Sequence, residues 1–228
     1  MSQKITPELQ RLIEARHHDP FALLGRHPQD NQLVVRVHLP YAKDVKITEG
    51  DLPLQRVANT DLFEWHGKPK QVPERYQLSW RDSDDNEYTA YDPYCFPPQI
   101  ADFDLYLFGE GKHWHAYRFL GAHPHVADGV SGVLFGVWAP NAERVSVVGR
   151  CHPMRGRGAS GIWELFVPGL CAGDLYKFEL RNRHSGVVFL KSDPYGQHFE
   201  MRPSTSTIVP KPDTYAWGDG AWMDKRKS

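Results

Sequence analysis

Val37-His38-Leu39-Pro40-Tyr41-Ala42-Lys43-Asp44-Val45 is matched one hundred residues later by Val137-Trp138-Ala139-Pro140-Asn141-Ala142-Glu143-Arg144-Val145. Further matches keep the same order at offsets of 96 to 101 residues: Leu24-Gly25-Arg26-His27-Pro28 with Leu120-Gly121-Ala122-His123-Pro124, Phe63-Glu64-Trp65 with Trp163-Glu164-Leu165, Tyr76-Gln77-Leu78 with Tyr176-Lys177-Phe178, and Asp92-Pro93-Tyr94 with Asp193-Pro194-Tyr195. One order at nearly one offset indicates an internal duplication, and so long a period is typical of tandem domains. We therefore predict two homologous domains, residues 1–105 and 106–228, with a seam near residues 102–112.

The hydrophobic pattern in each unit is that of short β-strands. Large apolar residues alternate with polar ones in 63–65 and 76–80, and the series repeats in the second unit. Alternation places one face in a core and the other in water. Several short strands separated by turns predict an all-β protein of two tandem immunoglobulin-like antiparallel β-sandwich domains. A short N-terminal helix is expected first, because Thr6 can cap it and Pro7 suits its first turn.

Length and composition limit the possible functions. Two such domains use almost all 228 residues, which leaves no room for a (β/α)₈ barrel of about 250 residues. The formal net charge of −1 gives no electrostatic reason to expect nucleic acid or an anionic membrane as a partner. Three cysteines without CxxC spacing favour reduced thiols in a cytoplasmic protein. The sequence contains no apolar run long enough to cross a membrane and no secretory signal.

Motifs for catalysis or metal binding are weak. There is no GxSxG, and Gly109-Glu110-Gly111-Lys112 lacks the spacing of a phosphate-binding loop. Twelve histidines include His17-His18 and two HxH pairs, but without evident carboxylate partners they are expected to be surface or capping residues. The basic loop from Gly149 to Gly158 is expected to be a solvated hairpin. The sequence predicts no metal site, no cofactor and no catalytic residue.

The tryptophans divide into two groups. Four occupy strand-like positions and are expected to pack in the cores: Trp65, Trp80, Trp138 and Trp163. Three lie outside the main strands and are freer to contact a ligand or a neighbouring domain: Trp114, Trp217 and Trp222.

Several longer motifs resemble a known family. They are His18-Asp19-Pro20-Phe21-Ala22-Leu23-Leu24-Gly25-Arg26-His27, Phe135-Gly136-Val137-Trp138-Ala139-Pro140-Asn141-Ala142, His152-Pro153-Met154-Arg155, Gly161-Ile162-Trp163-Glu164-Leu165-Phe166-Val167-Pro168 and Lys191-Ser192-Asp193-Pro194-Tyr195. Together they resemble the N-terminal region of bacterial glycogen branching enzymes. The resemblance implies an N-terminal sandwich domain followed by a family 48 carbohydrate-binding module and a linker toward a catalytic barrel, whose motifs these residues do not contain.

The resemblance also implies a function and partners. Complete enzymes of the family are glycosyltransferases of glycogen biosynthesis, which transfer α-1,4-glucan segments to form α-1,6 branches. The implied partners are α-1,4-glucan or glycogen and the catalytic barrel domain. Lys177 matches a lysine of the module and is a candidate glucan contact. The segment after Gly149 is shorter than in the family, and the tryptophan that commonly stacks on glucan there is missing, so we expect a weak site.

Three hypotheses remain open. The chain is a fragment of a branching enzyme, shortened before the barrel and non-catalytic by itself. It is a stand-alone glucan-binding or regulatory module. Or it is an interaction protein that docks through its first sandwich and has no affinity for sugar.

Overall fold

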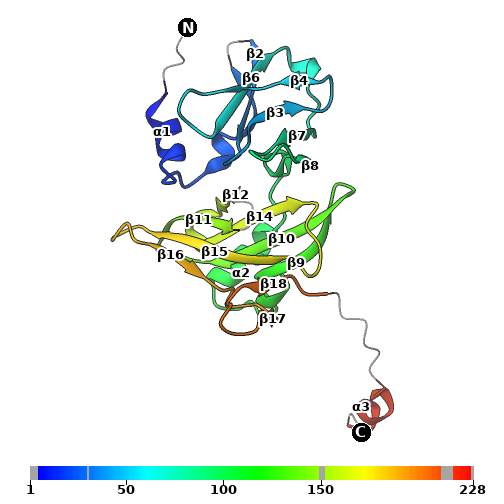
Figure 1. The fold of residues 1–228 in the computed structure, drawn as a ribbon. Coiled ribbons are helices and arrows are strands. Elements are labelled where there is room, and N and C mark those ends of the chain that lie inside the picture. The colour runs from blue at the N-terminus through cyan, green and yellow to red at the C-terminus, as the bar shows by residue number, and fades with distance from the viewer. Residues whose placement is uncertain (1–4, 30, 149–151, 212–217, 227–228) are drawn as a thin grey trace.

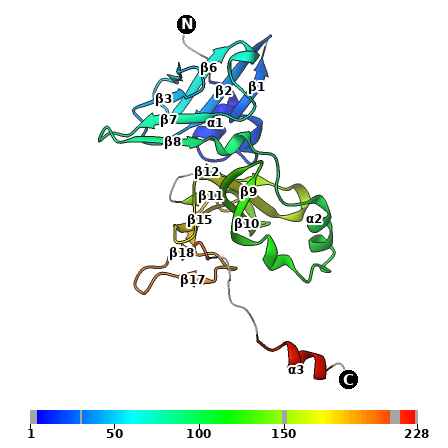
Figure 2. The same cartoon turned by 90° about the vertical axis from the view of Figure 1, so that its right-hand side faces the viewer.

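The computed structural model describes residues 5–29, 31–148, 152–211 and 218–226. Two β-sandwiches lie one above the other, with both layers of each visible in Figure 1 and the connecting segment along one side in Figure 2. The all-β prediction of two tandem sandwiches with a short N-terminal helix is confirmed. The α-helices are α1 (Pro7–Ile13), α2 (Asp102–Gly109) and α3 (Gly220–Lys225), and the 3-10 turns are η1 (Pro20–Ala22), η2 (Pro69–Gln71), η3 (Pro93–Cys95), η4 (Ala116–Arg118) and η5 (Gly158–Ser160).

The first sandwich pairs two antiparallel four-stranded sheets. One has the order β1 (Gly25–Gln29), β2 (Gln32–His38), β6 (Leu62–Gly67) and β5 (Gln55–Arg56). The other has the order β4 (Leu52–Pro53), β3 (Asp44–Ile47), β7 (Gln77–Arg81) and β8 (Glu87–Tyr91). Their facing side chains form a core around Val35, Phe63 and Tyr76, all nearly inaccessible to water.

The second sandwich repeats that topology. Its first sheet has the order β9 (Gly121–Ala127), β10 (Val130–Trp138), β14 (Ile162–Pro168) and β13 (Arg155–Gly156). Its second sheet has the order β12 (His152–Pro153), β11 (Ala142–Val148), β15 (Leu175–Asn182), β18 (Thr207–Ile208) and β17 (His198–Phe199), and β16 (Val188–Lys191) also pairs with β15.

The duplication extends to the strand register. The pair Val37–Phe63 of the first sandwich becomes Val137–Trp163 in the second, at an offset of 100 on both strands. Gly25 pairs with Arg36 as Gly121 pairs with Gly136. Because a slip of one residue would turn every core side chain outward, register is the property that a shared apolar pattern fixes most strongly.

The most similar short motifs perform the same structural task twice. Tyr76 donates its phenolic hydrogen to Oδ2 of Asp92, and Tyr176 donates to Oδ2 of Asp193 at 2.6 Å. In each Asp-Pro-Tyr motif the other carboxylate oxygen accepts from the backbone N–H two residues on. The aspartate thus holds the turn after its sheet and joins that turn to a strand.

Helix α1 forms as its sequence predicts. Thr6 caps it by accepting from the backbone N–H of Leu9, and Pro7 occupies the first turn. Leu9 and Leu12 are its buried residues, and they belong to a core cluster that extends into the second sandwich. The helix therefore helps to join the two domains.

The joint between the sandwiches is packed. Tyr94 donates its hydroxyl to the carbonyl of Pro153 at 3.1 Å, and Arg155 donates to the carbonyl of Phe96 at 2.9 Å. The guanidinium of Arg155 also lies 3.3 Å from the ring centroid of Phe21. The domain boundary predicted between residues 105 and 106 falls inside α2 and stays a prediction.

Candidate functional site

The predicted contact Lys177 lies on β15, on the outward face of its sheet. Its strand neighbours Tyr176 and Phe178 point into the core. The Lys177 ammonium donates to Oγ1 of Thr205 at 2.8 Å, and the Cα of Lys177 pairs with that of Val148. Val148 directly precedes residues 149–151, which lie outside the described residues. The prediction of a solvated hairpin from Gly149 to Gly158 is wrong for its described part, because His152 and Met154 are buried and β12 and β13 pair with strands of different sheets. Lys177 as a glucan contact stays a prediction.

The described outward side chains of β11 and β15 around Lys177 include no aromatic ring. The outward positions of the two neighbouring strands are occupied by Arg144, Ser146 and Val148 on β11 and by Leu175, Glu179 and Arg181 on β15. Arg144 forms an ion pair with Glu179 and donates to the hydroxyl of Ser146 at 2.7 Å. Part of this face is covered by the first sandwich, since Arg144 and Ser146 are buried although they point outward. On the described part of these two strands, Lys177 therefore has no aromatic partner.

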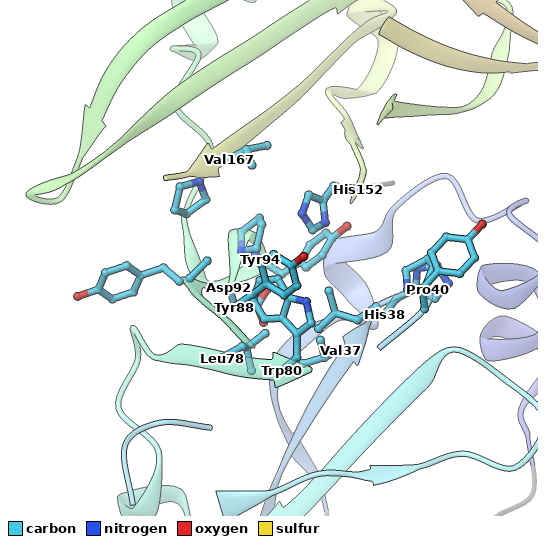
Figure 3. Close-up of a pocket in the computed structure, with 16 residues that line it drawn as sticks. Val37, His38, Pro40, Leu78, Trp80, Tyr88, Asp92, Tyr94, His152 and Val167 are labelled. Atoms are coloured by element: carbon cyan, nitrogen blue, oxygen red, sulfur yellow. The ribbon is translucent and has the colours of Figure 1, made fainter. Parts of the chain in front are cut away.

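A pocket, called the joint pocket below, lies where the two sandwiches meet. It has a volume of about 330 Å³, at the lower end of the roughly 300–1,000 Å³ range of ligand pockets. The first sandwich contributes the end of β2, the turn after it, β7 and β8, and the second contributes His152 and the end of β14. Figure 3 shows these side chains meeting from both domains. Most of the lining is aromatic or aliphatic, as in small-molecule sites generally.

Trp80 and Tyr88 form the aromatic wall of this joint pocket. They are directly paired across β7 and β8, and their rings stack 5.6 Å apart at an interplanar angle of 19°. The Tyr88 hydroxyl donates to Oδ2 of Asp82 at 3.0 Å. Asp82 also accepts from Asn86, and these bonds lower its pKa. The acidic turn between β7 and β8 thus fixes the position of the Tyr88 ring.

Tyr41 lies at the rim of the joint pocket in a strained backbone conformation. Its φ is 69°, in the left-handed region that non-glycine residues seldom occupy, and its side chain is 81% exposed. The second copy has Asn141 at this position. A bulky residue held with positive φ and pointing into solvent is a feature typical of binding sites.

His38 borders the joint pocket from the end of β2. Burial is the main cause that lowers its pKa, and Arg144 adds to the effect, while Asp61 opposes it. The imidazole is therefore neutral near pH 7. Within the described part of the chain, Nδ1 of His38 is buried without a hydrogen-bond partner.

Asp92 is the single acidic residue among the described residues that line this pocket. Burial raises its pKa to about 6, while the bonds from Tyr76 and from the Tyr94 backbone oppose the rise. Both of its oxygens are occupied by those bonds. Hydrolysis or transfer of a glycosidic bond by a carboxylate pair needs two carboxyl groups facing the sugar, so this arrangement suits binding and not that chemistry.

Histidine clusters and long apolar helices are the other features that could indicate a function. The described residues contain no cluster of three or more His, Cys, Asp or Glu side chains able to hold a metal ion. His113 lies 2.8 Å from Asp104, His123 is bonded to the carbonyl of Leu120 and His125 to Gln99. No helix in the described ranges has the length and apolarity needed to cross a bilayer. Gly109 ends α2, and Gly111 follows it with a positive φ, so this glycine pair closes a helix.

The tryptophan predictions are partly correct. Trp65 and Trp163 are buried, Trp80 is half-buried, and Trp114 is 90% exposed. Trp138 was expected in the core but is 54% exposed, so that prediction is wrong. Its neighbour Val137 points into the core, and strand alternation therefore turns Trp138 to the opposite face, where it contacts Phe108 at 6.1 Å. Trp222 is exposed, and Trp217 lies outside the described residues.

Sequence reasoning did not identify the joint pocket. Its residues come from two copies of the repeat, and no local pattern places them together. Two signals were present: the Trp80–Tyr88 pair that flanks an acidic turn, and a tyrosine at position 41 where the other copy has asparagine.

Comparison with known proteins yields matches in both halves of the chain. The family model described as alpha-1,4-glucan branching enzyme GlgB, N-terminal domain, matches residues 6–94. Carbohydrate-binding module 48 (isoamylase N-terminal domain) matches residues 119–196.

Curated relatives match along nearly the whole chain. The 1,4-alpha-glucan branching enzyme GlgB of Methylococcus capsulatus is 52% identical over 98% of this chain and 31% of its own length. The proteins of the same name from Nitrosococcus oceani and Cellvibrio japonicus are 53% and 51% identical, over 100% and 98% of this chain and 31% and 33% of their own lengths. The chain thus spans about a third of these relatives.

Proposed function

The chain belongs to the N-terminal region of the 1,4-alpha-glucan branching enzyme family, and from this we propose that it is the non-catalytic, glucan-contacting part of such an enzyme. In the complete enzyme, a catalytic barrel forms α-1,6 branches by transferring α-1,4-glucan segments during glycogen biosynthesis in the cytoplasm. The two sandwiches hold the glucan and dock on the barrel.

One observation carries this proposal. The two family models match successive parts of one chain, a branching-enzyme N-terminal domain and a carbohydrate-binding module, and relatives match through both parts and the connection between them. Relatives that match both modules at more than 50% identity indicate a function far more specifically than a β-sandwich fold does, because many unrelated functions share that fold.

Contact with a further domain is supported by exposed apolar side chains on the second sandwich and its flanking segments. Examples with at least half of the side chain exposed are Phe103, Tyr106, Trp114, Leu190 and Met201. Apolar side chains gathered on a surface are typical of interaction sites. We expect the isolated chain to self-associate at high protein concentration, as measured by light scattering, and monodisperse behaviour would count against docking through these residues.

The glucan-binding proposal is tested by electrophoresis of the 228-residue chain in native gels containing glycogen or amylopectin. The parent chain should be retarded, and Lys177→Ala should be retarded less because an ammonium donor to sugar hydroxyls is lost. Lys112→Ala, a substitution at a lysine 68% exposed in the segment after α2, is the matched control and should migrate like the parent.

Two results would contradict the proposal. An unretarded parent chain would favour an interaction protein that has no sugar affinity. A shift of the glucan–iodine absorbance spectrum on incubation with the chain would show that it branches glucan by itself.

A further inference from the structure

We propose that the joint pocket between the two sandwiches binds a short stretch of α-1,4-glucan, at a second site separate from Lys177. This inference takes its ligand class from the proposed function, and the site itself is assigned by the geometry of the pocket. The argument rests on the aromatic wall, the absence of free charge and the polar groups at the pocket edge.

The aromatic wall suits a pyranose ring. A sugar ring carries apolar C–H groups on its faces, which pack well against flat aromatic surfaces. Trp80 and Tyr88 present a stacked, cross-strand pair, and the Tyr88 hydroxyl is fixed to Asp82. An aromatic surface already held in one orientation loses little conformational freedom when a ligand binds.

The electrostatics of the pocket suit a neutral ligand. The described lining residues include no lysine or arginine, and their single carboxyl group, Asp92, is buried and bonded on both oxygens. Phosphate and carboxylate ligands are normally met by arginine, lysine or clustered backbone N–H groups. A glucan needs neither countercharge nor metal, and its hydroxyl groups match neutral donors and acceptors.

Neutral polar groups lie where hydroxyl groups would need them. Trp80 lines the pocket with its indole ring, and Nδ1 of His38 is buried in the pocket wall without a hydrogen-bond partner among the described residues. The exposed phenol of Tyr41 stands at the rim, on a backbone of positive φ. All three residues line the pocket from the first sandwich, and Figure 3 shows His152 facing His38 and Trp80 from the second. Bound glucan would therefore bridge the two domains.

The experiment uses the whole 228-residue chain labelled with ¹⁵N and titrated with maltoheptaose. The Trp80 indole N–H signal is identified by its loss in Trp80→Phe. We expect that signal to shift with added maltoheptaose while the Trp114 indole signal does not, because Trp114 is exposed and is not among the residues that line the pocket. Inorganic phosphate at the same concentrations should leave the Trp80 signal in place.

Variants separate the pocket from the Lys177 site. Tyr41→Asn removes the rim ring and supplies the residue found at the same position of the second copy, which tolerates a positive φ. It should weaken the maltoheptaose response of Trp80 at least tenfold, whereas Lys177→Ala should leave that response unchanged. Circular dichroism and thermal unfolding would verify that Tyr41→Asn is folded.

The outcomes distinguish the two claims. A Trp80 signal that stays still at millimolar maltoheptaose overturns the joint site, even if glycogen retardation that depends on Lys177 persists and the proposed function stands. A response to phosphate equal to that to maltoheptaose overturns the assignment of a neutral sugar. Loss of the Trp80 response in Lys177→Ala would mean that the pocket is not a separate site.

Discussion

At the scale of single residues, the duplicated Tyr–Asp bonds bury a carboxyl group in each sandwich. Asp92 and Asp193 are both inaccessible to solvent, and burial is the main cause that raises the pKa of each, opposed by their hydrogen bonds. Burying a carboxylate is unfavourable unless hydrogen bonds compensate it. The acid is retained in both copies because its two oxygens order a turn and a strand together.

Asp92 should make the stability of the chain depend on pH. Its pKa in the folded chain is about 6, above the ordinary 3.8, so its contribution to stability is fully present below pH 3.8 and is lost as the pH rises through 6. Two pKa units correspond to about 3 kcal/mol. Urea unfolding between pH 4.5 and 7.5 should show that the parent loses stability relative to Asp92→Asn as the pH rises.

A control at the hairpin tip isolates the effect of burial. Asp84→Asn, on an exposed turn, should follow the parent across the same pH range. Parallel pH profiles for the parent and Asp92→Asn would show that Asp92 is not the source of the dependence.

At the scale of elements, strand β10 depends on glycines that allow close packing. A Cβ atom at Gly136 would overlap the carbonyl oxygen of Phe119, and one at Gly132 would overlap that of Val167. Both opposing atoms belong to the backbone, which cannot rotate away as the end of a flexible side chain can. Glycine in a strand interior is otherwise unfavourable, so its presence here reflects the approach of neighbouring segments.

Gly136→Ala should destabilise the second sandwich by about 2–3 kcal/mol, because overpacking of this kind typically costs 1–3 kcal/mol. The measurement is the urea midpoint at constant slope. Gly109→Ala is the control, since no atom lies within 4 Å of the Cβ it would add and alanine favours a helix end over glycine. If both variants unfold at the same urea concentration, the close approach at β10 has no energetic weight.

Strand elements were more predictable than the site. Identical offsets in Val37–Phe63 and Val137–Trp163 predicted repeated sheets, because register follows directly from the alternation of apolar residues. The same alternation, followed one residue beyond the buried Val137, places Trp138 on the outer face of its sheet. The expectation that Trp138 lies in the core was wrong because the alternation was not followed that far. The joint pocket could not be predicted, because periodicity describes contacts within a strand pair and says nothing about how two sandwiches pack.

At the scale of the whole molecule, the sandwiches share a core. The cluster that contains Leu9 and Leu24 of the first domain continues through Phe135 and Tyr176 of the second. Arg155 adds its bond to Phe96 and its stacking on Phe21, and burial lowers its pKa to about 10. Domains that share a core are expected to unfold together.

Calorimetry should show a single transition for the parent, with equal calorimetric and van't Hoff enthalpies. Arg155→Ala removes a charge-assisted bond worth about 1.5–3 kcal/mol from the joint, and should broaden or split that transition. Arg81→Ala is the control, because its ion pair with Asp44 lies at the surface and is expected to contribute less than about 1 kcal/mol. Two transitions in the parent would contradict a shared cooperative unit.

The joint also shows how the two copies differ. The first sandwich contacts the β12–β13 edge of the second, which is a head-to-tail contact between related units. Such heterologous contacts propagate into filaments when every unit carries the same contact surface. The corresponding edge of the first sandwich is β4–β5. It has Gln55 at the position that Arg155 occupies in the second sandwich, and both residues of β5 are exposed. The two copies therefore differ at the edge through which they join, since the second presents a contact surface that the first does not repeat.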